Sequence, residues 1–265
     1  MCWRGDKIKV KVRGRKARAR LFIFRRLPLL LLTLVLGACG GPLPPPDSYN
    51  LAEAKDNLGQ GNHWYERGCY REAERFYLGG LEAARLSDNV LLIIRAQNSL
   101  GTAALASGDH NAAASYLEQA LNLASAHPQQ PELEKVLGNL GALAFKLGRN
   151  ADAHDFWIKA SETAEEKDLS AAPYYCDLAR LYLAEGRKEE FSAMVYKAMA
   201  ATNESEAFSR ADALNLAGRE AMGDNDLAKA EELLREALEL DQKTENTTGL
   251  AQDTEALGLL MVKLE

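Results

Sequence analysis

Two short stretches, NSLG at residues 98–101 and GNLG at residues 138–141, decide the fold of this 265-residue chain. Each stretch ends in a glycine, and a second glycine follows seven residues later, at Gly108 and at Gly148. In both cases an alanine comes five positions after that second glycine. The two stretches are 40 residues apart, so the sequence predicts an internal repeat of about that length.

The same pattern runs through the rest of the body. Corresponding anchor positions fall at 61, 101, 141, 179, 217 and 258, with spacings of 40, 40, 38, 38 and 41 residues. The last two full units are degenerate, and the fifth is expected to carry an extra residue in its turn, near GDND at 223–226. After Tyr49 the chain is rich in Ala, Leu, Glu and Lys, and no stretch shows sustained period-two alternation. The body is therefore predicted to be helical.

This pattern resembles the tetratricopeptide repeat, in which a small residue on one helix packs against a small residue on the next and a glycine makes the turn between them. The resemblance implies an all-α fold over residues 50–265, a right-handed α-α superhelix of about five helix-turn-helix repeats plus a C-terminal capping helix. The usual period of the family is about 34 residues. The excess predicts longer helices or longer loops, such as AHPQQPE at 126–132.

The first 38 residues have a different character. They carry eleven Lys or Arg and one acidic residue, and residues 27–38 read LPLLLLTLVLGA. A basic segment followed by a short apolar run is the arrangement of a signal peptide, and twelve residues are too few to span a bilayer as a helix. The end of this run together with the following cysteine, LGAC at 36–39, resembles the lipobox of bacterial lipoproteins.

The lipobox resemblance implies a signal peptide at residues 1–38 and a lipidated Cys39 that starts the mature chain. Residues 39–49 hold four prolines and are expected to form an extended tether. Gly40 after the cysteine favours the outer membrane in Gram-negative relatives. The expected location is therefore the bacterial cell envelope, with the protein lipid-anchored in the outer membrane and facing the periplasm.

Charge and composition exclude several classes of function. From Cys39 onward the chain has 21 basic and 37 acidic residues, a net charge of −16. A body this acidic argues against nucleic acid as a partner. The four histidines are scattered over different repeats, and no metal-binding, phosphate-binding or nucleophile motif appears. We therefore expect no metal, no cofactor and no catalysis.

Candidate binding residues follow from the family resemblance, which places a set of first-helix positions on the concave face. The predicted partner-binding residues are Lys55, Asn62, Tyr65, Arg95, Asn98, Lys135, Phe145 and Arg180. A cationic row in an acidic protein suits an extended peptide that carries acidic groups or a free carboxylate. The alternative is that these cations only solvate exposed helix faces. The carboxylate clamp of some tetratricopeptide cochaperones is incomplete, because Leu58 and Ser99 stand where Lys and Asn are expected.

The preferred hypothesis is a membrane-anchored scaffold or assembly factor of the envelope that binds proteins or peptide segments. The alternative is a periplasmic chaperone or carrier that holds a small acidic ligand or a glycan in the superhelix. The last helix, at 250–264, has an apolar stripe formed by Leu257, Leu260, Met261 and Leu264, which also permits a homo-oligomer.

Overall fold

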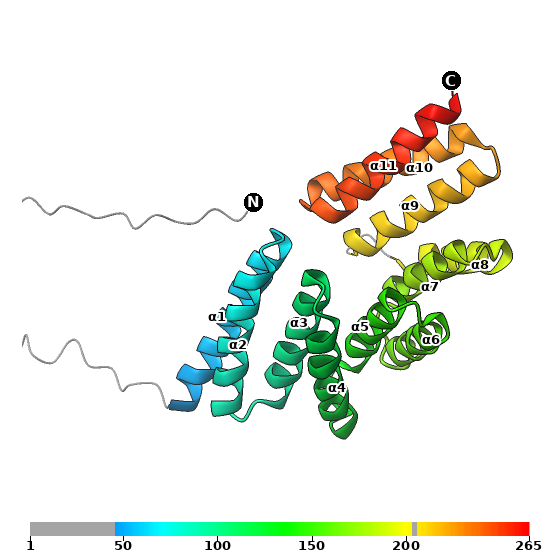
Figure 1. Ribbon diagram of the computed structural model, residues 1–265. Coiled ribbons are helices and arrows are strands. Elements are labelled where there is room, and N and C mark those ends of the chain that lie inside the picture. The colour runs from blue at the N-terminus through cyan, green and yellow to red at the C-terminus, as the bar shows by residue number, and fades with distance from the viewer. Residues whose placement is uncertain (1–45, 203–205, 265) are drawn as a thin grey trace, which may run out of the picture.

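The computed structural model describes residues 46–202 and 206–264, which form eleven helices and no strand. The helices are α1 (Pro46–Glu66), α2 (Tyr70–Leu86), α3 (Val90–Ser107), α4 (His110–Ala126), α5 (Leu133–Lys146), α6 (Asn150–Glu166), α7 (Ala172–Ala184), α8 (Lys188–Ala201), α9 (Ala207–Gly223), α10 (Leu227–Lys243) and α11 (Thr247–Leu264). Each even-numbered helix packs on the odd-numbered helix before it, and the pairs follow one another in an arc (Figure 1). The predicted all-α superhelix of five helix pairs and a closing helix is confirmed.

The first helix begins earlier than predicted. Residues 46–49, assigned from the sequence to the extended tether, form the first turn of α1. Pro46 can start a helix because the first turn needs no hydrogen bond from its amide. The predicted signal peptide, the lipidation site at Cys39 and the rest of the tether lie outside the described residues.

Close packing within each pair depends on the anchor glycines. In the first three pairs, the anchor glycine touches the side chain sixteen residues later on the second helix. These contacts join Gly61 to Tyr77, Gly101 to Leu117, and Gly141 to Trp157. An added Cβ at any of these glycines would lie less than 3.0 Å from the facing side chain. Glycine is therefore required for the two helices to approach this closely.

The fifth pair corrects the predicted register. Its anchor is Gly218, which faces Leu234 at the same offset of sixteen residues, and not Ala217. The turn residue seven positions after Gly218 is Asn225, with φ of 63°, where the four earlier turns have a glycine with positive φ. Asparagine tolerates this left-handed conformation better than most residues. The expected extra residue in the turn is therefore absent, because the anchor lies one position later.

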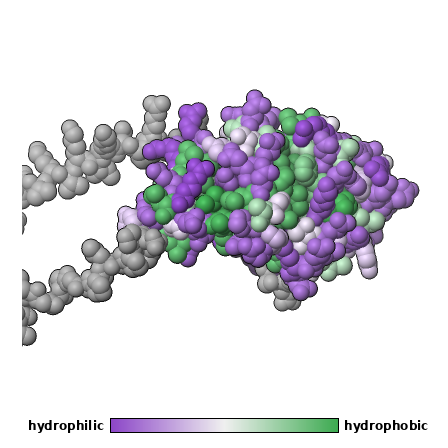
Figure 2. Space-filling model, turned by 90° about the horizontal axis from the view of Figure 1, so that it is seen from below, coloured by the Kyte–Doolittle hydropathy of each residue, from purple (hydrophilic) through white to green (hydrophobic). Residues whose placement is uncertain are grey.

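The core is divided along the array. Buried apolar residues form four clusters, each built mainly from neighbouring helices, as expected when each repeat packs only on the next. Hydrophilic side chains cover most of the face seen in Figure 2, and hydrophobic ones gather near its middle. In the described part of the chain, no helix combines the length and apolar character needed to cross a membrane.

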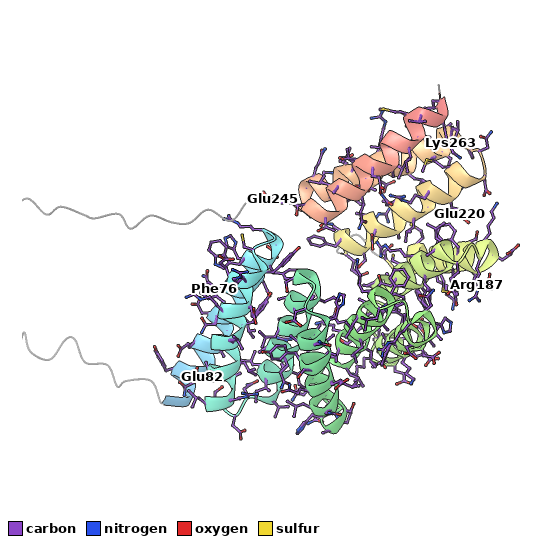
Figure 3. The ribbon with its side chains drawn as sticks, viewed as in Figure 1. Phe76, Glu82, Arg187, Glu220, Glu245 and Lys263 are labelled. Carbon is purple, nitrogen blue, oxygen red and sulfur yellow. The ribbon has the colours of Figure 1, made fainter. Side chains whose placement is uncertain are left out.

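The closing helix α11 packs on α9 and α10. Leu260 is buried in the last apolar cluster, and Lys263 donates from Nζ to the carbonyl of Met222 over 2.9 Å (Figure 3). Gly258 faces open space, because no further helix follows it in the described chain. The predicted apolar stripe is divided, since Leu260 is buried whereas Met261 and Leu264 are exposed.

Candidate peptide-binding groove

The odd-numbered helices form the inner surface of the arc. Each contacts the next odd-numbered helix, from α1 to α3 and onward to α11, whereas the even-numbered helices lie outside them (Figure 1). Cavities lie between successive inner helices, and they share lining residues. These cavities form a groove along the inner helices. The family resemblance predicts that certain positions of the first helix of each pair line this groove.

Two of these cavities form the N-terminal part of the groove. The N-terminal cavity, between α1, α3 and α5, has a volume of about 460 Å³ and is lined by Lys55, Asn62, Arg95, Asn98 and Lys135 among others. The central cavity, between α3, α5 and α7, has a volume of about 600 Å³. Arg95, Asn98 and Lys135 line both cavities, so the two are continuous. Five of the eight predicted binding residues thus lie together.

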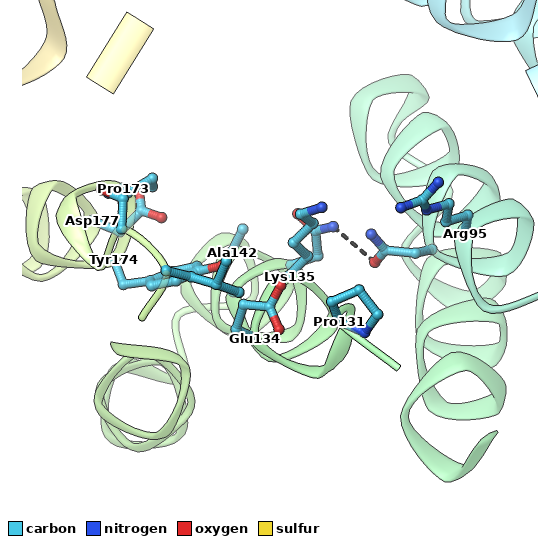
Figure 4. A pocket seen from close by; sticks show the side chains of 13 residues that line it. Arg95, Pro131, Glu134, Lys135, Ala142, Pro173, Tyr174 and Asp177 are labelled. Carbon is cyan, nitrogen blue, oxygen red and sulfur yellow. Dashed lines mark hydrogen bonds between the residues drawn. The ribbon is translucent and has the colours of Figure 1, made fainter. Parts of the chain in front are cut away.

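A pair of asparagines crosses the boundary between these two cavities. The Asn139 amide nitrogen donates to Asn98 Oδ1 over 2.8 Å (Figure 4, dashed line) and also to Thr102 Oγ1 over 3.3 Å. Neither Asn98 Nδ2 nor Asn139 Oδ1 has a hydrogen-bond partner among the described residues. The pair therefore presents one donor and one acceptor to the groove, on two successive inner helices. Sequence reasoning selected Asn98 but missed Asn139, which lies 41 residues later in the next repeat.

The predicted cationic row is partly neutralised. Arg95 donates from Nε to Glu132 Oε1 over 2.6 Å, and Lys135 Nζ lies 3.5 Å from the same oxygen. The Glu132 side chain is only 3% exposed, whereas Arg95 and Lys135 are about half exposed, so a buried carboxylate is paired with two cations at the surface. Lys55 makes no ion pair with any described residue. The row thus keeps one unpaired cation at its α1 end and two cations that share one carboxylate.

A second buried carboxylate, Glu134, lines the central cavity (Figure 4). Its side chain is 3% exposed, and neither of its oxygens has a hydrogen-bond partner. Lys167 Nζ is 3.6 Å from Oε2, beyond hydrogen-bond distance. Burial and the neighbouring Glu134 carboxylate raise the pKa of Tyr174, which lines the same cavity, so its hydroxyl stays protonated. Sequence reasoning identified neither residue.

Three predicted residues lie elsewhere. The Tyr65 ring packs 5.3 Å from that of Tyr70, and the Phe145 ring packs 5.8 Å from that of Trp157. Neither residue lines the N-terminal or the central cavity. Arg180 lines a third cavity, of about 440 Å³, between α7, α9 and α11.

The residues at the clamp positions also lie in the groove. Leu58 and Ser99 line the N-terminal cavity beside Asn62 and Lys135. Asn62 already accepts a hydrogen bond from the Tyr77 hydroxyl over 2.8 Å. The cavity therefore offers a leucine side chain and a hydroxyl where the cochaperone clamp has an ammonium and an amide. Over residues 46–202 and 206–264, no group of three or more His, Cys, Asp or Glu is arranged to hold a metal ion.

Family models of the tetratricopeptide repeat match residues 50–126 and 211–244. No curated protein matches the sequence at a significant level. Several solved structures are similar in fold. One is a thermophilic tetratricopeptide repeat protein of Thermus thermophilus, with 18% identity over 77% of this chain and 98% of the other, at a TM-score of 0.54.

Two longer structures are also similar. Aspartyl phosphate phosphatase F from Bacillus subtilis has 15% identity and a TM-score of 0.62, covering 81% of this chain and 57% of the other. A Rap protein in complex with competence and sporulation factor has 15% identity and a TM-score of 0.59, covering 84% of this chain and 66% of the other. This chain thus spans between half and two thirds of their length. At these identities the likeness concerns the fold.

Proposed function

We propose that this protein is a lipid-anchored scaffold of the bacterial cell envelope that holds an extended segment of a partner protein in its groove. The matches of tetratricopeptide-repeat models to residues 50–126 and 211–244 support a role in protein binding. The acyl groups on Cys39 anchor it in the outer membrane on the periplasmic side, and the proline-rich segment spaces the repeats from the lipid. The helical array itself contributes a binding surface and no chemistry.

The asparagine pair is the observation that carries this proposal. An extended peptide backbone presents one carbonyl acceptor and one amide donor per residue, and both need partners when they leave water. Asn98 Nδ2 and Asn139 Oδ1 supply the complementary donor and acceptor on adjacent helices. Contacts of this kind bind main chain independently of side-chain identity, which suits a groove that accepts a segment of another protein. The Rap complex gives a precedent for ligand binding in this fold.

Support for the membrane anchor comes from the sequence. The window at 36–39 ends in the cysteine that lipoproteins acylate, and it follows a basic segment and a short apolar run. Each buried methylene contributes about 0.8 kcal/mol, so several acyl chains hold a protein at a membrane stably. Incorporation of labelled palmitate tests this step. Wild type should take up the label and Cys39→Ser should not, whereas equal labelling of the two would refute the anchor.

A carrier of a small acidic ligand or a glycan is the second candidate. It is favoured by the unpaired Lys55 and by cavity volumes of about 460 and 600 Å³, which fall within the range of small-molecule sites. The continuity of the two cavities favours the scaffold instead, because an extended segment can cross both. Mass spectrometry of the material that copurifies with the full-length protein separates the two candidates.

The decisive experiment is capture of partners from detergent-solubilised envelopes by the full-length protein. Replacing both asparagines, Asn98→Ala with Asn139→Ala, should reduce capture of the specific partner by about tenfold or more, because two hydrogen bonds to main chain are lost. Asn122→Ala is the matched control, since Asn122 is exposed on the outer helix α4. Equal capture by the double variant and wild type would move the binding surface away from the groove.

A further inference from the structure

Two buried glutamates begin the inner helix α5, and only one of them is satisfied. Glu132 accepts a hydrogen bond from Arg95 and lies 3.5 Å from Lys135. Glu134 is equally buried, yet both of its oxygens lack a hydrogen-bond donor. A carboxylate that leaves water without donors destabilises the fold, so buried carboxylates are normally paired and hydrogen-bonded. The carboxylate of Glu134 therefore keeps unused hydrogen-bonding positions at the wall of the central cavity, which a donor reaches when that side chain turns toward it.

The nearest cation does not meet this requirement. Lys167 Nζ is 3.6 Å from Glu134 Oε2 and donates instead to the carbonyl of Gln130 over 3.3 Å. Lys167 does not line the central cavity. Its charge offsets part of the cost of burying Glu134, but it leaves the hydrogen-bonding positions of the carboxylate unused.

The α7 side of the central cavity suits a long basic side chain, whereas Arg95 and Lys135 on its α3 side are engaged by Glu132. Asp177 supplies a second carboxylate on its α7 wall, where it also pairs with Arg180 over 3.1 Å. Ala142, Leu169 and Pro173 supply apolar surface in the lining of the same cavity (Figure 4 shows Ala142, Pro173 and Asp177). Lysine and arginine side chains combine an apolar stem with a charged end, and they bury the stem along such surface.

We infer that the central cavity binds a lysine or arginine side chain of the partner segment, whose ammonium or guanidinium donates to Glu134. This inference rests on the proposed function, since it places one side chain of the segment whose backbone meets Asn98 and Asn139. The net charge of −16 from Cys39 onward makes a basic segment the complementary partner. The inference thus differs from the sequence-based prediction, in which the cationic row of the groove binds an acidic peptide.

Selection of random heptapeptides on the full-length protein in detergent micelles tests the inference. Selected peptides should share a lysine or arginine, and replacing that residue by norleucine should weaken binding by about tenfold or more, because a charge-assisted hydrogen bond is lost. In Glu134→Gln the lysine and norleucine peptides should bind equally, whereas Glu118→Gln, an exposed site on α4, should keep the discrimination. Discrimination retained in Glu134→Gln, or selected peptides without a basic residue, would overturn it.

A second variant separates binding from a structural role of Glu134. Lys167→Met removes the competing cation, so it should increase the preference for lysine over norleucine. A purely structural role predicts no increase.

If no heptapeptide is selected, peptide binding by the groove fails, and the cation site is then tested alone. N-acetyl-lysine N-methylamide is titrated against its norleucine analogue and followed by NMR. Glu134-dependent binding of the lysine compound keeps the inference, and its absence overturns it.

Discussion

Between α3 and the start of α5 the inner helices are joined by two neutral amides, Asn98 and Asn139, beside the ion pair of Arg95 with Glu132. Between α7 and α9 they are joined by Arg180, which is held between Asp177 and Asp212. The same helix pair thus recurs along the chain, but the neutral amide contact between α3 and α5 gives way to a charged contact between α7 and α9. The hydrogen bond between two neutral amides does not depend on pH in the ordinary range. It also leaves one amide donor and one amide acceptor unused, which a ligand can bind. In the contact between α7 and α9, by contrast, Arg180 is paired with two carboxylates, and the strength of these ion pairs depends on whether the carboxyl groups are protonated.

The contrast is greater at the end of the array. Asn215 on α9 donates to Asp253 on α11 over 2.7 Å, and the side chain of Asp241 on α10 lies against Gly249 at the start of α11. Burial raises the pKa of Asp253 to about 6; the hydrogen bond from Asn215 opposes the shift and the Asp241 carboxylate adds to it. Burial also raises the pKa of Asp241. The closing helix therefore depends on two interacting acids, and the N-terminal groove does not.

The largest expected effect is a pH dependence in the second half of the array, where burial raises the pKa of Asp177 on α7, of Asp241 and of Asp253. The unfolded chain releases the Asp253 proton near pH 4, and the folded chain holds it to about 6. Folding thus takes up a proton between these values, so the free energy of unfolding decreases as the pH rises through this window. A shift of this size corresponds to about 3 kcal/mol. Urea unfolding at a series of pH values measures it.

Asp253→Asn should remove the Asp253 part of that dependence, leaving the parts from Asp241 and Asp177. The variant should exceed wild type in stability at about pH 7.5, with no gain at about pH 4, because the amide still accepts from Asn215 without a buried charge. Asp56→Asn, at an exposed position on α1, is the matched control. Native-state hydrogen exchange should locate the pH-dependent opening in α7 and in α9 to α11, where these acids lie. Opening of α3 to α6 instead would break the comparison between the two ends.

The next largest effect concerns the anchor glycines. A Cβ at Gly141 would lie 2.5 Å from Trp157 Nε1, and that indole is fixed by its 3.0 Å hydrogen bond to the Gly138 carbonyl. Overpacking of about 3 kcal/mol, less about 1 kcal/mol for the better helix propensity of alanine, gives a net loss of about 2 kcal/mol for Gly141→Ala. A Cβ at Gly218 would lie 2.7 Å from Cγ of the fully buried Leu234, so Gly218→Ala should also destabilise. Its loss should be smaller than that of Gly141→Ala, because no hydrogen bond fixes the leucine side chain.

Chemical denaturation of both variants, with Gly258→Ala as the control, measures this difference. Gly258 faces open space, so alanine there should stabilise by up to about 1 kcal/mol. Equal losses of stability in Gly141→Ala and Gly218→Ala would show that the third and the fifth helix pair tolerate overpacking alike.

Much of the fold could be predicted because the repeat offsets express a packing geometry. The glycine at 61, 101 or 141 and the large side chain sixteen residues later are both visible in the sequence. The fifth unit was misaligned at Ala217 because its turn uses Asn225 in place of glycine, so the most regular sequence marker was missing. The left-handed turn position is hard to predict because asparagine as well as glycine can occupy it. The close helix contacts at 61, 101 and 141 are easier to predict because they require glycine.

Less of the site could be predicted. First-helix positions on the concave face followed from the family geometry, and five of them line adjoining cavities. Acidic residues near a helix start are normally solvated, so Glu132 and Glu134 gave no signal. Their burial depends on the loop at 126–132 and on Lys167 at the end of α6, which bonds to that loop from another part of the chain. Tertiary contacts of this kind leave no local pattern.

The smallest expected effect separates stability from binding in the cationic row. Arg95→Met leaves the buried Glu132 with only Lys135, 3.5 Å away, and should cost about 1 kcal/mol. Lys55→Met should cost nothing measurable, because Lys55 has no ion pair with a described residue and is exposed. Thermal unfolding of the two variants measures this difference, and a loss in Lys55→Met equal to that in Arg95→Met would contradict it. Reversing Lys55, Arg95 and Lys135 together would mix both effects, so Lys55→Glu alone isolates the contribution of groove charge to partner capture.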